Sequence, residues 1–424
     1  MRILFLVQNY PPERGPVRYT RDLALALAAR GHKVEVITGL PHYPFGAPYP
    51  GFGRFRTVAR TEDGVRVIRV PLVMGSNTQV PRRLAGFLTF ALSALPRALG
   101  GRRPDVIVAS CPPLTVVPLG LLAARLRRVP CVAMLRDVEP VISLQLRGME
   151  DRLWARALTR GALATYRAAD RRVVVHESQR DTLIGLGIDP AGVETIPHGI
   201  DVPAFVRRME TDAPPALPRR EGRRLGLYLG TIGVAHDLRR LVLAFADEKV
   251  RSLPLDLAIV GDGECRAECE RLVAERGLES VRILPPVPLE AVPATLGAAD
   301  VLFHSYRTGA APIPGQVGSK LYEYFAAARP VIVAGDGYAT RLVLTIGNGW
   351  TCRADDPASV AAAIRRYLAD PAAAAELGLR GRAYAAEHFA ASARHDRWEA
   401  LLAQTVEDRN TARPRGRVPL KGAK

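Results

Sequence analysis

The segment GAAPIPGQVGSKLYEYFAAARPVIVAGDG, residues Gly309–Gly337, places a loop rich in glycine and proline before a short helical run and a wholly apolar strand. A strand without polar residues is typical of parallel sheets, whose strands are buried on both faces. In the helical run, Lys320 and Glu323 are three residues apart and share one face, close to the free N–H groups of the helix start. This combination predicts a site for an anionic ligand that carries hydroxyl groups.

The same alternation of apolar strands and helical segments extends through the chain. In the first half, strands are expected at residues 3–7, 33–38, 105–110, 131–135 and 172–175, and helices at 20–30, 119–127, 149–167 and 177–186. The series restarts with strands expected at 225–229, 255–260, 281–284, 301–304 and 330–334. Such a series predicts an α/β protein with two doubly wound, Rossmann-like domains that face each other across a cleft.

The length of 424 residues also favours two domains, since one domain usually has roughly 100–200 residues. Residues 202–224 are rich in proline and charge and have neither hydrophobic period, which is typical of an exposed linker. We therefore expect an N-terminal domain at 1–201, a linker at 202–224 and a C-terminal domain at 225–389. A helix at 390–406 is expected to cross back, and the basic tail at 407–424 is expected to be disordered.

The formal net charge of +17 would suit a nucleic-acid-binding protein. The arginines are spread along the chain, however, and neither zinc-finger spacing nor an aromatic RNA-binding signature occurs, so we rank this function last and expect no nucleic-acid partner. The five cysteines are scattered, which indicates reduced thiols and neither a disulfide framework nor a metal site. The chain opens on an apolar strand without a secretory signal pattern, so we expect a cytoplasmic protein.

The longest apolar run, Leu84 to Leu95, is too short for a membrane span, which needs about 20 residues. Arginines flank it on both sides, at positions 82, 83, 97, 102 and 103. A helix on an anionic membrane surface and a helix that faces the core are equally compatible with this pattern. Peripheral contact with the inner face of the cell membrane is therefore an open expectation.

Two glycine loops follow predicted strands of the second half. Gly230 and Gly233, in LGTIG, lie where missing side chains would let backbone N–H groups approach a phosphate. Gly261 and Gly263 follow the next strand in VGDG, where a tight turn that ends the strand is the alternative interpretation. Both loops belong to one edge of the predicted sheet, so they are candidates for donor binding.

The opening segment adds charged groups to the same edge. Ser319 is expected to cap the helix, Lys320 to neutralise phosphate oxygens and Glu323 to accept hydrogen bonds from ribose hydroxyls. Gly315 and Gly318 keep the preceding loop open. The alternative is a surface pair of Lys320 and Glu323 worth about 0.3 kcal/mol, but the bulky aromatic residues around the pair favour a binding site.

Taken in order, the motifs resemble a known family. They are QNYPPERGPVRYTRDLALALAARGHKVEVIT, GLPHYPFGAPYPGF, PDVIVASCPP, LRDVEP, ETIPHGID, LGTIG, VGDG and GSKLYEYFAAARPVIV. The chain resembles the retaining GT-B glycosyltransferases of family four, particularly the bacterial branch that transfers amino sugars in surface-polysaccharide assembly. The resemblance implies a nucleotide-diphosphate sugar bound mainly by the second domain and an acceptor, such as a lipid-linked glycan, bound mainly by the first. It implies no cofactor, and the branch favours UDP as the nucleotide.

The resemblance also implies roles for single residues. Glu323 matches the second of the family's two motif glutamates, which holds the ribose, whereas Gly315 stands where the first is usual. Near the amino terminus Gly15 and Pro16 replace a pair of glycines beneath the diphosphate, and Arg18 is a candidate for supplying charge there or a solvated arginine at a helix start. The basic residue usual after the LGTIG loop is missing at 234–236, so Lys320 is expected to stabilise the leaving group.

Asp137, in LRDVEP, follows a predicted strand and matches the family's acidic position beside the acceptor; capping of the next turn is the alternative. Glu139 is a second carboxylate two residues on, and His198 is interpreted as structural. The family resemblance implies retention by front-face attack, without a metal. Three rival functions remain: a sugar-nucleotide epimerase, a glycosyltransferase for soluble natural products, and a nucleic-acid-binding protein.

Overall fold

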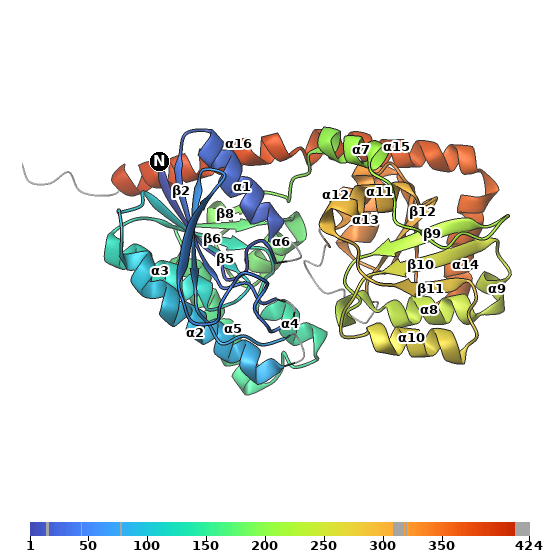
Figure 1. The fold of residues 1–424 in the computed structure, drawn as a ribbon, viewed down its shortest axis with the longest axis horizontal. Helices are drawn as coiled ribbons and strands as arrows, with labels where there is room; N and C mark the ends of the chain where they lie inside the picture. Colours follow the sequence, from blue (N-terminus) through green and yellow to red (C-terminus); the bar gives the residue numbers. More distant parts are fainter. Residues whose placement is uncertain (14–16, 44, 77–78, 308–317, 319, 412–424) are drawn as a thin grey trace, which may run out of the picture.

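The computed structural model describes residues 1–411 except 14–16, 44, 77–78, 308–317 and 319. Its first α/β unit is built on a mostly parallel sheet in the order β3-β4-β2-β1-β5-β6-β7-β8, in which β3 is antiparallel to β4 (Figure 1). The strands are β1 (Arg2–Leu6), β2 (Lys33–Gly39), β3 (Val58–Glu62), β4 (Val65–Val70), β5 (Val106–Cys111), β6 (Cys131–Leu135), β7 (Arg171–Val174) and β8 (Val193–Thr195). Three of these strands, β3, β4 and β8, were not expected from the sequence.

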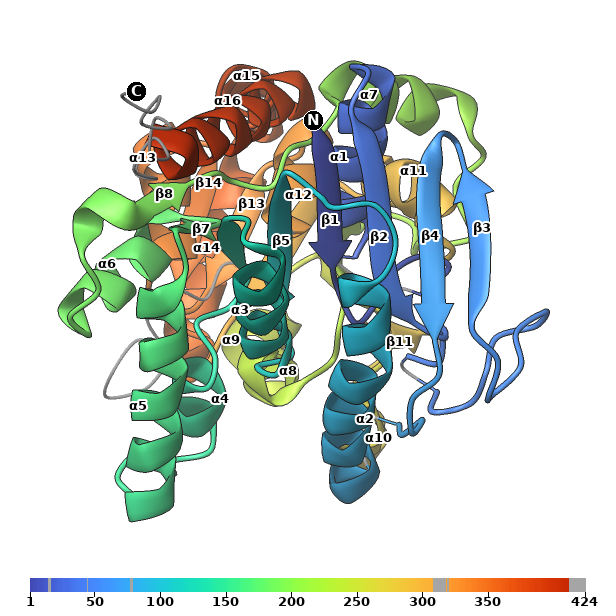
Figure 2. The ribbon, with the colours of Figure 1, turned by 90° about the vertical axis from the view of Figure 1, so that its left-hand side faces the viewer.

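Alternate residues of β1 enter different cores, which is why this strand has no polar face. Ile3 and Phe5 pack with α1, whereas Leu4 and Leu6 pack with α2 and α3. The helices of this unit are α1 (Arg18–Ala29), α2 (Val80–Leu99), α3 (Val116–Arg127), α4 (Val141–Leu146), α5 (Leu153–Ala168) and α6 (Glu177–Gly185). In Figure 2 the lower ends of α2 and α5 extend beyond the sheet on the side where the parallel strands end.

The second unit has a wholly parallel sheet in the order β11-β10-β9-β12-β13-β14. Its strands are β9 (Arg224–Leu229), β10 (Leu255–Val260), β11 (Val281–Leu284), β12 (Val301–Ser305), β13 (Val331–Ala334) and β14 (Gly349–Cys352). Its helices are α8 (Leu238–Ala246), α9 (Glu248–Arg251), α10 (Arg266–Glu275), α11 (Val292–Gly297), α12 (Lys320–Ala326), α13 (Tyr338–Ile346), α14 (Pro357–Ala369) and α15 (Pro371–His388). The predicted α/β class with two Rossmann-like domains is confirmed.

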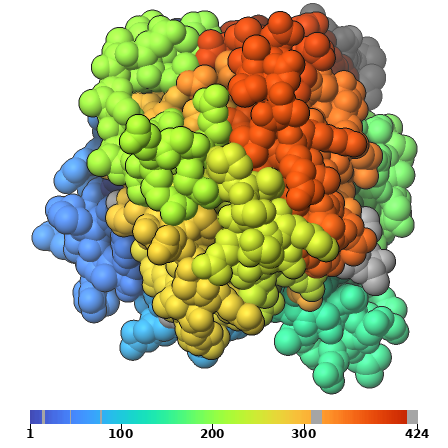
Figure 3. All heavy atoms as spheres, turned by 90° about the vertical axis from the view of Figure 1, so that its right-hand side faces the viewer, coloured from blue at the N-terminus to red at the C-terminus, as the bar shows by residue number. Residues whose placement is uncertain are grey.

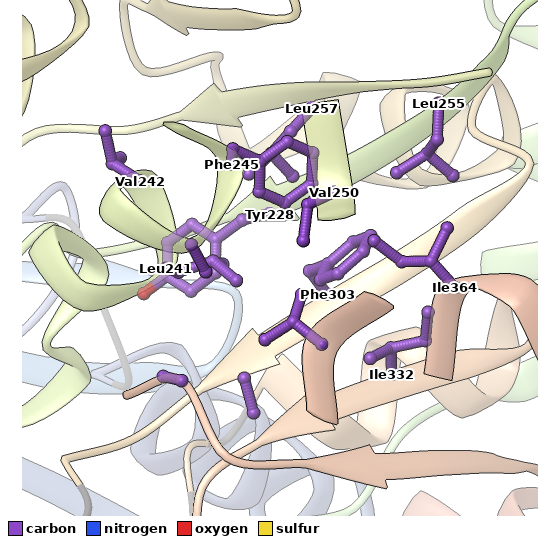
Figure 4. Close-up of a cluster of buried hydrophobic side chains, with 14 of the residues drawn as sticks. Tyr228, Leu241, Val242, Phe245, Val250, Leu255, Leu257, Phe303, Ile332 and Ile364 are labelled. Carbon is purple, nitrogen blue, oxygen red and sulfur yellow. The ribbon is translucent and has the colours of Figure 1, made fainter. Parts of the chain in front are cut away.

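The two faces of the second sheet have separate cores. On one face, Phe245 and Phe303 meet edge to face with ring centroids 6.1 Å apart, among the aliphatic side chains shown in Figure 4. The other face is covered by α11, α12, α13 and α15. Because helices bury both faces, the ends of the strands are the part of this sheet that is left for a ligand.

The predicted linker is wrong in its first half. Residues Val202–Thr211 form helix α7, which Asp201 caps by accepting a hydrogen bond from the backbone N–H of Ala204. Val202 and Phe205 enter the core of the second domain, where α7 packs on α11 and α15. On the outer face of the molecule in Figure 3, the green α7 segment lies next to the orange-red α15. The charges of this segment lie on the solvent side of an amphipathic helix.

The last helix, α16 (Ala391–Thr411), lies along the first domain beside α1 (Figure 1). Trp398 and Leu402 are buried in the core of that domain, and Glu399 bonds to Arg30 and His32. The helix extends to residue 411, so the prediction of a disordered tail from 407 is wrong for its first five residues; 412–424 lie outside the described residues. Within the described residues, no helix is both long enough and apolar enough to cross a membrane.

Candidate active site

The strand ends of the second domain bring the predicted glycines and Lys320 together. A Cβ atom on Gly230, which follows β9, would lie 2.4 Å from Lys320 Nζ, and one on Gly261 would lie 1.8 Å from the Gly230 carbonyl oxygen. Gly263 has a φ of 155° and would place a Cβ 2.4 Å from the Ile232 carbonyl oxygen. These three positions therefore exclude any side chain. At Gly233 the nearest atom would be 3.5 Å away, so close packing does not require glycine there.

Lys320 is the first residue of α12 and lies over an aromatic ring. Its Nζ donates to the hydroxyl of Tyr228 at 2.6 Å and lies 4.2 Å from the centroid of that ring. Burial lowers the pKa of Lys320 to about 7, although the charge of Glu323 acts in the opposite direction. A buried amine whose hydrogen-bond acceptor is a neutral phenol is ready to exchange that acceptor for an anion.

Glu323 lies one turn further along α12 and is bound by the other domain. Arg18 Nη2 donates to Glu323 Oε1 at 2.6 Å, and 24% and 10% of the two side chains are exposed. Burial alone would lower the pKa of Arg18, but Tyr19 and Glu323 raise it. Arg18 therefore stays charged and is paired with the carboxylate that the sequence assigns to the ribose. Both donor-binding assignments remain predictions.

Aromatic rings extend the contact between the domains. The rings of Tyr19 and His198 are stacked 4.1 Å apart, and Tyr322 of α12 meets His198 edge-on at 6.3 Å. Burial lowers the pKa of His198 well below its usual value, and Arg394 is the next largest cause. His198 is thus a neutral ring packed between the domains, which is compatible with the structural role expected for it.

The two carboxylates after β6 differ in their contacts. Glu139 accepts a hydrogen bond from the Ser143 hydroxyl at 2.6 Å. No described residue donates a hydrogen bond to the half-buried carboxylate of Asp137, and burial raises its pKa although Arg136 opposes that shift. Asp137 is close enough to Tyr306 of the second domain to raise the pKa of its hydroxyl, after the larger effect of burial. Of the two, Asp137 is therefore the carboxylate that faces the opposite domain with free oxygens.

Two predicted donor-binding residues, Gly315 and Ser319, lie outside the described residues. Gly318 is described: a Cβ there would lie 2.8 Å from the Tyr306 hydroxyl and 3.1 Å from Cε1 of His304. The backbone N–H of Gly318 donates to the Tyr306 hydroxyl. Gly318 is therefore held against Tyr306, the residue that follows β12.

Sequence reasoning missed Glu13, which fixes the loop between β1 and α1. Its carboxylate accepts hydrogen bonds from the backbone N–H groups of Tyr10, His42 and Tyr43 at 3.0, 2.9 and 2.8 Å. Burial raises the pKa of Glu13 to about 7, although the three N–H groups lower it. The available signal was a glutamate inside the motif QNYPPERG, two residues before the Gly15–Pro16 pair at which the chain departs from the family pattern.

Three further residues of the site, Tyr228, His236 and His304, were also not assigned. The sequence predicts only strands or turns for the segments that contain them. The fold brings all three side chains close to Lys320. In the described parts of the chain, no group of three His, Cys, Asp or Glu side chains is placed to hold a metal ion. That transfer needs no metal stays a prediction.

Comparisons with known proteins agree with this architecture. Residues 14–199 match the glycosyl transferase 4-like domain, and residues 209–384 match the glycosyl transferases group 1. The chain is 28% identical over 350 residues to WcaI of Escherichia coli, whose name assigns it to glycosyl transfer in colanic acid biosynthesis; 80% of this chain and 84% of WcaI are covered. It is 30% identical over 431 residues to the D-inositol 3-phosphate glycosyltransferase of Kineococcus radiotolerans, which covers 93% of this chain and 91% of the relative.

Among solved structures, the fold is similar to that of HepE from Anabaena in complex with UDP-glucose. The TM-score is 0.66 at 19% identity, and the likeness covers 96% of this chain and 100% of HepE. At this identity the likeness shows the fold alone. Together with the two matched domains and the full-length relative, it establishes the family: the chain belongs to the GT-B glycosyltransferases of family four.

Proposed function

We propose that this glycosyltransferase moves a sugar from a nucleotide-diphosphate donor to a lipid-linked glycan intermediate and retains the anomeric configuration. The favoured donor is a UDP-sugar, and the favoured sugar is an N-acetylhexosamine. The observation that carries the donor half is Lys320, a half-buried amine at the glycine-lined strand ends that forms no salt bridge with a described residue. HepE, whose fold is similar, binds UDP-glucose.

We assign separate roles in the transfer reaction to the residues of the site. As the bond between the anomeric carbon and the diphosphate oxygen breaks, negative charge grows on the leaving group. Lys320 and the N–H groups of the Gly230 loop would stabilise that charge, an effect worth about 3 kcal/mol per well-placed donor. The acceptor oxygen bonds to the same face of the sugar and gives up its proton to the leaving oxygen. Asp137 would hold the acceptor hydroxyl from the first domain, a role supported by its effect on Tyr306 of the second domain.

The acceptor half of the proposal rests on an apolar surface of the first domain. Leu84, Leu88 and Leu92 form one stripe along α2, and Leu92 is 71% exposed. At the start of α5, Leu153 is 84% exposed and Trp154 lies beside it. Figure 2 shows that α2 and α5 project on the same side of the sheet. We call these five residues the apolar surface.

Exposed arginines lie on the same two helices at Arg82, Arg97 and Arg160, and Arg152 directly precedes α5. Leucines and tryptophan with a rim of arginines match a membrane that carries anionic lipids, because the apolar chains enter the interface while the guanidinium groups meet phosphates. A helix start that follows a parallel strand lies at the edge where the strands end, and that edge also carries Asp137. The membrane would thus deliver a lipid-linked acceptor next to the site.

Transfer can be measured with labelled UDP-N-acetylglucosamine and a lipid extract from bacterial membranes. We expect label in the lipid fraction, attached with the anomeric configuration of the donor. Release of an epimerised nucleotide sugar without any acceptor would favour the epimerase. Label that enters soluble acceptors but no lipid would favour the natural-product alternative.

Membrane contact is tested by sedimentation with vesicles of phosphatidylcholine alone or with added phosphatidylglycerol. We expect the full chain to sediment with the anionic vesicles, and the double variant Leu88→Glu, Leu92→Glu to remain in the supernatant. Leu379→Glu is the matched control, because Leu379 is 56% exposed on α15 of the other domain. Equal sedimentation of all three proteins, or none by the wild type, would contradict the membrane contact.

A further inference from the structure

Two histidines of the second domain, His236 and His304, lie near Lys320 and have no role in the reaction proposed above. His304, near the end of β12, is fully buried, and neither of its ring nitrogens has a hydrogen-bond partner in the described parts of the chain. An unpaired buried polar group normally lowers the stability of the folded state. A group retained at that cost in a binding site calls for an explanation in terms of the ligand.

His304 lies directly beneath the start of α12. Its Cε1 would be 3.1 Å from a Cβ on Gly318, and its ring meets that of Tyr306 edge-on at 4.6 Å. His304 and Lys320 lie close enough together for the positive charge of the lysine to lower the pKa of the imidazole, after the larger effect of burial. His304 therefore packs beneath Gly318 and Lys320 at the start of α12.

His236 approaches the same amine from the glycine loop. It lies three residues after Gly233, and its half-buried ring packs between Tyr228, at 6.1 Å, and Tyr306, at 5.3 Å. Its Nδ1 lies 3.3 Å from the backbone carbonyl oxygen of Ser305, which leaves Nε2 as the nitrogen available to a ligand. Burial lowers the pKa of His236 well below its usual value, and Lys320 lowers it further.

Lys320, His236 and His304 thus lie together where the donor diphosphate is proposed to bind. Few of the described groups around them carry negative charge. The surrounding phenols and charged groups are Tyr228, Tyr306, Tyr324, Glu323, Asp137, Arg18, Glu264 and Arg307. The phenols are neutral, and Glu323 is already paired with Arg18. Among the described residues, burial and the charge of Lys320 therefore favour the uncharged forms of His236 and His304, whereas only Glu323 favours the charged form of Lys320.

We propose that His236 joins Lys320 in contacting the donor diphosphate, that His304 acts beneath them as a positioning residue, and that the cluster takes up protons when the diphosphate binds. The inference rests on the proposed donor site. A diphosphate brings negative charge into a buried space and stabilises the protonated forms of all three groups. His236 then supplies the positive charge that relatives obtain from a basic residue after this loop. Donor affinity should fall as the pH rises above neutrality, by about tenfold per pH unit for each proton taken up.

Calorimetry on the full chain counts these protons. UDP-N-acetylglucosamine and GDP-mannose are titrated at about pH 8 in buffers of different ionisation enthalpy, since uptake of a proton by the protein adds the heat of ionising the buffer. Both probes have doubly esterified diphosphates, which exchange no proton of their own near neutrality. We expect uptake on the order of one proton per bound donor, and less in His236→Asn and in His304→Asn.

His388→Asn is the control, because His388 is an exposed histidine of the same domain. Its proton uptake should equal that of the wild type. Circular dichroism shows whether His304→Asn is folded, and His236→Asn, at a half-buried turn, tests the inference independently. Donor binding without proton uptake, or equal uptake in both histidine variants and the wild type, would overturn the inference alone. Failure of the folded wild type to bind either probe would overturn the proposed donor site with it.

Discussion

Replacement of Glu323 by alanine should weaken UDP binding far more than replacement of its partner Arg18 by methionine. In the structure, Oε1 of Glu323 is bound by Arg18, and Oε2 has no donor among the described residues. A ribose with two adjacent hydroxyls can donate to Oε2 and share Oε1. Hydrogen bonds to a charged acceptor contribute about 1.5–3 kcal/mol each, so Glu323→Ala should cost about 2–3 kcal/mol, or roughly 30–150-fold in Kd.

Arg18→Met removes the guanidinium that bonds to the carboxylate from the other domain. It frees Oε1 for the ribose and should change the UDP affinity by less than about 1 kcal/mol. Calorimetric titration with UDP of the wild type, both single variants and the double variant separates the two roles of Glu323. Glu290→Ala is the control, because Glu290 is an exposed carboxylate of the same domain.

Two outcomes would refute this reasoning. If Glu323→Ala binds UDP as tightly as the wild type, the carboxylate does not hold the ribose. If Glu323→Ala and Arg18→Met weaken binding equally, and the double variant is no weaker than either, the ion pair as a unit is what donor binding requires. In that case Glu323 serves to hold the domains together.

The remaining predictions concern Lys320, Trp398 and Glu13. Lys320→Met should leave the free energy of unfolding unchanged or raise it by about 1 kcal/mol, because it removes a partly buried amine. The same variant should weaken UDP binding more than about tenfold. Chemical denaturation measures the first effect and calorimetry the second. Trp398→Ala should destabilise the first domain by about 3–5 kcal/mol, as chemical denaturation will show, because Trp398 is 2% exposed in its core. Burial raises the pKa of Glu13 from 4.5 to about 7, so its stabilising contribution is present below pH 4.5 and is lost as the pH rises through about 7. Glu13→Gln should flatten that loss, which thermal unfolding at about pH 5 and about pH 8 will reveal.

The strands were predictable from the sequence where burial on both faces removes every polar residue. The run Val331–Ala334 is one such strand, and its apolar character follows from helices on both sides of the sheet. The edge strand Val58–Glu62 was missed because only one strand pairs with it, and it carries exposed polar residues. Apolar runs identify the centre of such a sheet better than its edges.

Helix α7 was not predicted, because the many prolines and charged residues of 202–224 are typical of an exposed linker. Asp201 followed by Pro203 is a recognisable helix start, and the buried face of α7 is carried by only Val202 and Phe205. The Arg18–Glu323 pair lay beyond any local pattern, since 305 residues separate its members. Only the fold brings those two charges to 2.6 Å.

Two charged groups of the site are stabilised in different ways, and one ligand could replace both. Glu323 is neutralised by Arg18 of the other domain, whereas Lys320 is relieved of charge by a lowered pKa. A nucleotide diphosphate offers hydroxyls to the first and an anion to the second. Because the partner that Glu323 would share belongs to the first domain, donor binding in the second domain acts directly on the contact between them. The strength of that contact and the affinity for the donor would therefore be linked through one carboxylate, and a variant at Glu323 should change both.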